Sequence, residues 1–143
     1  MEIKQEGSDF IVNFTIRASR EAVHKLLVEI GGLKQWWENP VKGTPGQGGN
    51  LRFEFQDSDE HSVMLVDLAT ADKVQWTVIE DTGFNGEWVG TTIIFELRQK
   101  DEHHIEMKFR HIGLTPDLKS YEPCKKAWRY YLTNIKKIAE QVT

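Results

Sequence analysis

Apolar and polar residues alternate along several short segments of the chain. Residues 10–16, "FIVNFTI", place Phe10, Val12, Phe14 and Ile16 on one side, as expected of a half-buried strand. Similar alternation, or a mostly apolar run, recurs in five later segments, at residues 50–55, 61–69, 73–80, 91–99 and 104–111. The connections among these five are too short for crossover helices, so the pattern predicts a six-stranded antiparallel sheet.

Between the first two strands, the apolar spacing changes to three and four residues. Ser19 is a candidate N-cap for a helix whose apolar positions extend to Ile30. Gly31-Gly32 is expected to end or kink this helix, and Leu33 to Trp37 to form one further short turn. The run from Glu38 to Asn50 holds two prolines and four glycines, which predicts a loop.

The last segment has one continuous apolar stripe at helical spacing. It predicts a helix over residues 120–141, with Ser120 as N-cap and Pro123 in the first turn. Basic residues lie around the other side of this helix. The elements together predict a single α+β domain over residues 1–143, in which a curved sheet wraps around the long helix. Such an arrangement can leave an elongated apolar cavity between the two layers.

The segments "IRASREAVHKLL", "LKQWW", "GGNLRFEF", "VDLATADKVQWT", "TTIIFEL", "FRHIGL" and "AWRYYLTNIKK" follow one another in the chain. In this order they resemble the START-like (SRPBCC) helix-grip superfamily and, more narrowly, the activator of heat-shock protein 90 ATPase homologue family. The resemblance covers nearly the whole chain. It implies a helix-grip fold with two short helices after strand 1 and a scaffold that binds small apolar molecules. It also implies relatives that catalyse cyclisations or act as a chaperone's partner domain.

Composition narrows the range of partners. The formal net charge is −4 and no basic run exceeds two residues, which argues against nucleic acid and anionic membrane surfaces as partners. No apolar stretch approaches the length of a membrane helix, and the first ten residues are too polar for a signal peptide. We therefore expect a cytoplasmic monomer without a cofactor. The single cysteine, Cys124, excludes an intramolecular disulfide, and we expect it to be an inert, half-buried thiol.

The glycine cluster "GTPGQGG" at residues 43–49 does not form a nucleotide site. No Lys-Ser or Lys-Thr follows it, and Leu51 stands where a dinucleotide fingerprint needs its last glycine. The cluster also leads into a strand, so no helix N-terminus is available to hold a phosphate. No histidine or acidic pattern has metal-ligand spacing, and no metal site is predicted.

Trp36 and Trp37 are the first candidates for a binding site. Adjacent helical residues point about 100° apart, so we expect one indole in the core and the other partly exposed. The pair would then rim the entrance of the cavity and stack on an apolar or aromatic ligand.

His111 lies on the inward face of its strand, with Met107 and Phe109. One interpretation is a core histidine bonded to the backbone or a neighbour. The alternative is a polar anchor for a ligand, or a general base, with a pKa lowered by burial. The complete set of candidate cavity residues is Trp36, Trp37, Phe53, Phe55, Trp76, Met107, Phe109, His111, Trp128, Tyr131, Leu132 and Ile135.

Three functions are compatible with this pattern. The first is a non-catalytic module that binds a small apolar or aromatic molecule in the cavity. The second is a protein-interaction module with a closed interior, such as a partner of a chaperone ATPase, with Trp37 or Trp88 on its exposed working face. The third is a cyclase/aromatase-like or hydrolase-like enzyme that uses His111 or Tyr131 for proton transfer. No catalytic residue is predicted with a partner at defined spacing.

Overall fold

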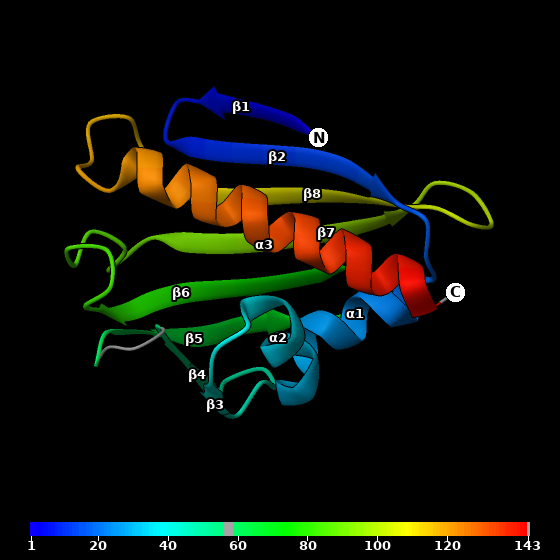
Figure 1. The fold of residues 1–143 in the computed structure, drawn as a ribbon, viewed down its shortest axis with the longest axis horizontal. Coiled ribbons are helices and arrows are strands. Elements are labelled where there is room, and N and C mark those ends of the chain that lie inside the picture. Colours follow the sequence, from blue (N-terminus) through cyan, green and yellow to red (C-terminus); the bar gives the residue numbers. More distant parts are fainter. Residues whose placement is uncertain (56–58, 143) are drawn as a thin grey trace.

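The computed structural model describes residues 1–55 and 59–142, which form two layers (Figure 1). Within these residues there are eight strands and three helices. The strands are β1 (Glu2–Glu6), β2 (Asp9–Ile16), β3 (Val41–Gly43), β4 (Asn50–Glu54), β5 (His61–Ala69), β6 (Lys73–Asp81), β7 (Thr92–Gln99) and β8 (Ile105–Ile112). The helices are α1 (Arg20–Val28), α2 (Ile30–Trp37) and α3 (Tyr121–Val142).

The strands form one curved antiparallel sheet in the order β1-β2-β8-β7-β6-β5-β4-β3. Helix α3 lies across one face of it, and α1 and α2 lie beside the C-terminal half of α3 (Figure 1). Alternate strand residues and the apolar stripe of α3 form a single buried core. The predicted helix over residues 120–141 and the two-layer α+β architecture are confirmed.

The prediction of six strands was wrong, because β1 and β3 add one strand at each edge of the sheet. Strand β1, "EIKQE", has one apolar residue and is mostly exposed. Strand β3 has three residues and lies inside the segment that its prolines and glycines assigned to a loop. An edge strand bonds to one neighbour and buries little, so its sequence carries a weak apolar signal.

The helix boundary near Gly31-Gly32 also differs from the prediction. Glu29, in an extended conformation, ends α1 and precedes α2, so both glycines lie inside α2. A Cβ atom on Gly32 would lie 2.2 Å from the carbonyl oxygen of Lys25, so glycine allows the two helices to approach closely. The predicted cap of α1 is confirmed, because the Ser19 hydroxyl accepts a hydrogen bond from the Ala22 amide at 3.1 Å.

Residues 70–72, which separate the predicted strands at 61–69 and 73–80, form the turn that joins β5 to β6. The connection between the predicted strands at 50–55 and 61–69 lies partly outside the described residues. Ser120 immediately precedes α3, as predicted, but its hydroxyl donates a hydrogen bond to Glu87 at 2.6 Å. The Glu87 carboxylate also accepts from the amides of Lys119 and Ser120, so it adds a negative charge at the start of α3, where Glu122 lies in the first turn.

Candidate functional site

Trp36 and Trp37 are both buried, with 0% and 1% of their surfaces exposed. The expectation that one indole is partly exposed, and that the pair rims a cavity entrance, was therefore wrong. The two rings point in different directions, as predicted, at an interplanar angle of 88°. Both rings contact Phe53 and Tyr131, because α2 packs against α3 and against β3 at the end of the sheet.

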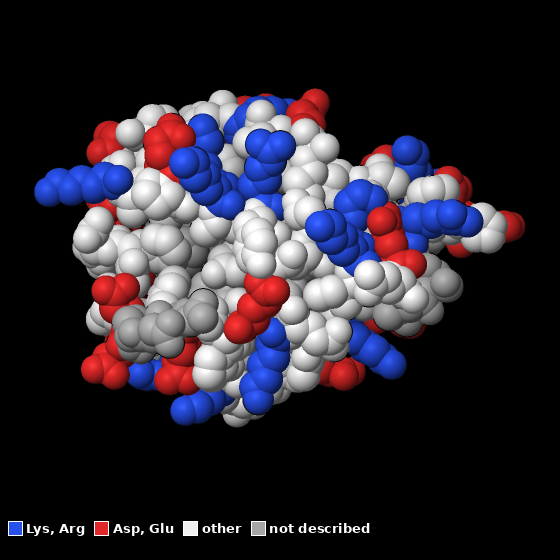
Figure 2. All heavy atoms as spheres, in the orientation of Figure 1, with Lys and Arg blue, Asp and Glu red and all other residues white. Residues whose placement is uncertain are grey.

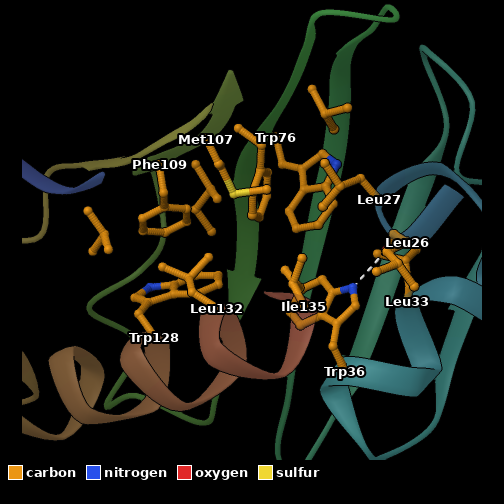
Figure 3. Close-up of a cluster of buried hydrophobic side chains, with 14 of the residues drawn as sticks. Leu26, Leu27, Leu33, Trp36, Trp76, Met107, Phe109, Trp128, Leu132 and Ile135 are labelled. Atoms are coloured by element: carbon orange, nitrogen blue, oxygen red, sulfur yellow. Dashed lines mark hydrogen bonds between the residues drawn. The ribbon is translucent and has the colours of Figure 1, made fainter. Parts of the chain in front are cut away.

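Each indole N–H group of the pair bonds to a backbone carbonyl group. Trp36 donates to the carbonyl oxygen of Leu26 at 2.7 Å (Figure 3), and Trp37 donates to that of Glu54 at 2.7 Å. Trp37 also stacks on Tyr131 of α3, with ring centroids 4.5 Å apart. Both tryptophans thus tie α2 to its neighbours and have no polar atom left for a ligand.

Aromatic rings from the helix and from the sheet meet directly at the centre of the interior. Trp128 of α3 lies 4.5 Å from Phe109 and 5.7 Å from Trp88, measured between ring centroids. Toward α2, Trp76 lies 5.4 Å from Phe53. Figure 3 shows Leu132 and Ile135 of α3 extending from the helix toward the sheet-side residues Met107 and Trp76. At all these positions, side chains occupy the space in which a ligand cavity was predicted.

The twelve predicted cavity residues are therefore brought together, as parts of the packed core. Ten of them are buried, while Phe55 and Tyr131 are half-buried. Phe55 packs against Trp37 at 5.4 Å and against Phe84 at 5.2 Å. Burial raises the pKa of the Tyr131 hydroxyl to about 12, which disfavours the phenolate that proton abstraction by this group would require.

His111 is fully buried in a chain of hydrogen bonds. The Trp128 indole N–H donates to His111 Nδ1 at 3.0 Å, so Nε2 carries the proton and donates to Thr91 Oγ1 at 2.8 Å. The Thr91 hydroxyl donates in turn to the carbonyl oxygen of Trp88 at 2.6 Å. Desolvation lowers the pKa of His111 to about 3, so the ring is neutral at pH 7. This geometry supports the interpretation of a core histidine, because both ring nitrogens have partners.

Cys124 is buried more completely than expected. Its sulfur accepts a hydrogen bond from the Trp88 indole at 3.0 Å, and burial raises the pKa of the thiol to about 11. Trp88 itself is 1% exposed, so neither it nor Trp37 lies on an exposed working face as the interaction hypothesis expected. The thiol has none of the properties of a reactive cysteine.

Trp76 carries a buried polar atom that has no partner in the described part of the chain. Its indole N–H is buried and finds no acceptor among the described residues. Such a group costs about 1–3 kcal/mol when left unpaired. In Figure 3 the ring lies on the sheet side of the core.

Two acidic residues that the sequence did not single out organise the loop before β7. The buried Asp81 carboxylate accepts hydrogen bonds from the Ser62 hydroxyl at 2.8 Å and from the amides of Gly83, Phe84 and Trp88. Glu87 reaches the start of α3 from the same loop. Asp is a common residue at the start of a Gly-rich turn, and this pattern is the signal by which the sequence could have indicated Asp81.

The structure also has a groove of about 740 Å³ on the outer face of the sheet. Outward side chains of β2, β7 and β8 line it, including Asn13, Glu96 and Lys108, and the hairpin between β5 and β6 closes one side. Of the predicted residues, only Met107 contributes to the lining. In residues 1–55 and 59–142, no group of three His, Cys, Asp or Glu side chains could hold a metal ion.

No helix in the described part of the chain is long and apolar enough to cross a membrane. A family model described as Activator of Hsp90 ATPase homolog 1-like protein matches residues 17–140. No curated protein sequence matches the chain.

Several solved structures share the fold. The Aha1 dimer from Colwellia psychrerythraea is 24% identical, with a TM-score of 0.79 over 92% of this chain and 96% of that chain. An HSP90 activator from Plasmodium falciparum is 18% identical, with a TM-score of 0.75 over the same shares. CalU16 from Micromonospora echinospora is 12% identical, with a TM-score of 0.69 over 90% and 71%.

Proposed function

The chain belongs to the family of Activator of Hsp90 ATPase homolog 1-like proteins, and from this premise we propose that it is a protein-binding module. The observation that carries the proposal is the closed interior. Rings of α3 and of the sheet pack directly on one another, and the indole groups of Trp36, Trp37, Trp88 and Trp128 all have partners. A ligand between the layers would have to displace these rings and break their hydrogen bonds. The working surface is then an outer face.

An Hsp90-type chaperone ATPase is the first partner to test, because one relative of the same fold is described as an HSP90 activator. Purified chaperone is titrated with the full chain, and both the heat of binding and the rate of ATP hydrolysis are measured. We expect a complex and a faster rate. A catalytically inactive chaperone variant measures contaminating hydrolysis. Absence of binding, together with an unchanged rate at saturating concentrations of the chain, would contradict the choice of partner.

A second candidate function is the binding of a small apolar or aromatic molecule. The observation in its favour is the Trp76 indole N–H, which is buried without an acceptor. A ligand carbonyl or hydroxyl oxygen that entered beside Trp76 would satisfy this donor. The rings of Phe55 and Tyr131 are half-buried at the edge of the core, and such a ligand would enter beside them.

The test is a titration with lipids and aromatic metabolites, followed by amide chemical shifts and tryptophan fluorescence. The Trp76→Phe variant removes the unpaired donor and keeps an aromatic ring. Loss of ligand binding in Trp76→Phe, with binding retained in Tyr130→Phe as a control on the outer surface, would support this function. If no compound shifts the amides of inward-facing residues, this candidate is wrong.

A further inference from the structure

The solvent-facing side of α3 carries a row of cationic residues. Lys126, Arg129, Tyr130, Thr133 and Lys137 follow the spacing of three and four residues that places side chains on one face of a helix. Lys126, Arg129, Tyr130 and Lys137 are exposed, and Thr133 is half-buried. We refer to these five residues as the cationic stripe.

Charge is distributed unequally between α3 and the rest of the chain. Residues 121–142 hold five basic and two acidic residues, whereas the remaining residues hold 13 basic and 20 acidic ones. Figure 2 views the face on which α3 lies, and Lys and Arg side chains follow the course of the helix. An acidic protein thus presents a positive band along α3, which attracts acidic surfaces.

The cations of the stripe differ from the other lysines of α3 in their ion pairs. Lys125 pairs with Glu122 at 3.7 Å, and Lys136 pairs with Glu140. Within the described residues, no carboxylate lies within ion-pair distance of Lys126, Arg129 or Lys137. Three neighbouring positive charges that form no ion pair within the described residues are available to a partner.

Tyr130 adds an aromatic surface in the middle of the stripe. Tyr130 is one of the few large apolar residues on the surface, and 53% of its surface is exposed. Its hydroxyl donates to the Glu38 carboxylate and its ring contacts Tyr131 at 5.7 Å, so the ring is held in place. An ordered, exposed tyrosine between cations has the character of an interface anchor.

On the basis of the proposed protein-binding function, we infer that the cationic stripe docks an acidic segment of a partner protein. Asp or Glu side chains of the segment would pair with Lys126, Arg129 and Lys137, and an apolar side chain would cover Tyr130. A nucleic acid fits less well, because three cations neutralise few phosphates and the rest of the molecule is acidic. The same acidic surroundings would repel an anionic membrane.

The test uses a probe that is independent of the chaperone. A labelled amphipathic peptide, with Glu along one face and a single Phe among them, is titrated against the full chain by fluorescence anisotropy and amide chemical shifts. Binding to the variant Lys126→Glu/Arg129→Glu/Lys137→Glu is expected to fall about tenfold or more. The matched control, Lys25→Glu/Lys34→Glu/Lys100→Glu, has the same net charge and reverses exposed lysines outside α3. It should stay within about twofold of wild type.

Amide shifts from the peptide should map to residues 126–137 and disappear at high salt. The inference is wrong if the shifts map elsewhere or if both triple variants lose binding equally. It is also wrong if single-stranded DNA or phosphatidylserine vesicles bind the stripe more tightly than the peptide, or if the stripe proves to join two copies of this chain.

If the chaperone binds equally well to wild type and to the stripe variant, the stripe inference fails and the protein-binding function stands. If the peptide binds the stripe but the chaperone does not bind, only the choice of chaperone fails.

Discussion

The inner and outer faces of α3 differ in how completely their polar groups are satisfied. On the inner face, Trp128 is buried against aromatic rings and its N–H group bonds to His111. One residue further, Arg129 is exposed on the solvent-facing side, and no ion pair holds it within the described structure. The aromatic inner face of α3 therefore stabilises the fold, whereas the outer face carries charged groups that are available to a partner. Abundance of aromatic side chains did not by itself locate a binding site.

The largest expected effect comes from truncating the inner face. Trp128→Ala should lower the free energy of unfolding by about 3–5 kcal/mol, because it leaves a cavity and unpairs His111. Arg129→Ala, the adjacent residue on the outer face, should change it by no more than about 0.5 kcal/mol. Urea unfolding of both variants measures the contrast. A loss below about 1 kcal/mol for Trp128→Ala would mean that the interior is loosely packed.

A smaller effect is expected from His111→Leu. The change leaves the Trp128 N–H without its acceptor and removes a partner from Thr91, which should cost about 1–3 kcal/mol. Thermal unfolding of the variant, with and without candidate ligands, measures this. A variant with wild-type stability that has lost binding would instead identify His111 as part of a ligand site.

The protonation of His111 gives a third contrast between the faces. The folded pKa is about 3 and the ordinary value is 6.5. Between these values the unfolded chain binds one more proton, so the contribution of neutral His111 to stability is lost as the pH falls through this range. Between about pH 7.5 and 5.5, wild type should lose about 1.4 kcal/mol more than His111→Leu. Equal losses in the two proteins would show that the imidazole is not held neutral.

The smallest expected effect is on the outer face. Lys126→Glu/Arg129→Glu/Lys137→Glu should unfold within about 0.5 kcal/mol of wild type, because no described contact depends on these charges. Circular dichroism and urea unfolding test this together with the binding assays. A large loss of stability would show that the stripe has a structural role, which would contradict the difference between the two faces of α3.

The sequence was sufficient for elements whose residues alternate between core and solvent. Strand β2 and helix α3 each turn a regular row of apolar side chains toward the core, so their periodicity predicted both their type and their inward side chains. Strand β1 buries almost nothing, and the three residues of β3 lie among glycines, so neither produced a period.

The outcome at the predicted site depended on packing that periodicity does not contain. The inward direction of Trp128 and His111 followed from spacing, but their mutual hydrogen bond joins residues from two distant segments. Whether the space between the layers stays open depends on how several large rings fit together. The burial of Trp37 required knowing that α2 lies against Tyr131.

Cys124 is a probe of local opening between α3 and the loop that carries Trp88. It is the only thiol in the chain, and Trp88 and the first turn of α3 enclose it, with a pKa of about 11 for the thiol. At neutral pH, a thiol-reactive dye can therefore label Cys124 only after the start of α3 has separated from the loop that carries Trp88. When closing is faster than labelling, the labelling rate reports the population of these brief openings. A partner that docks on α3 would slow the labelling of Cys124 without contacting its sulfur.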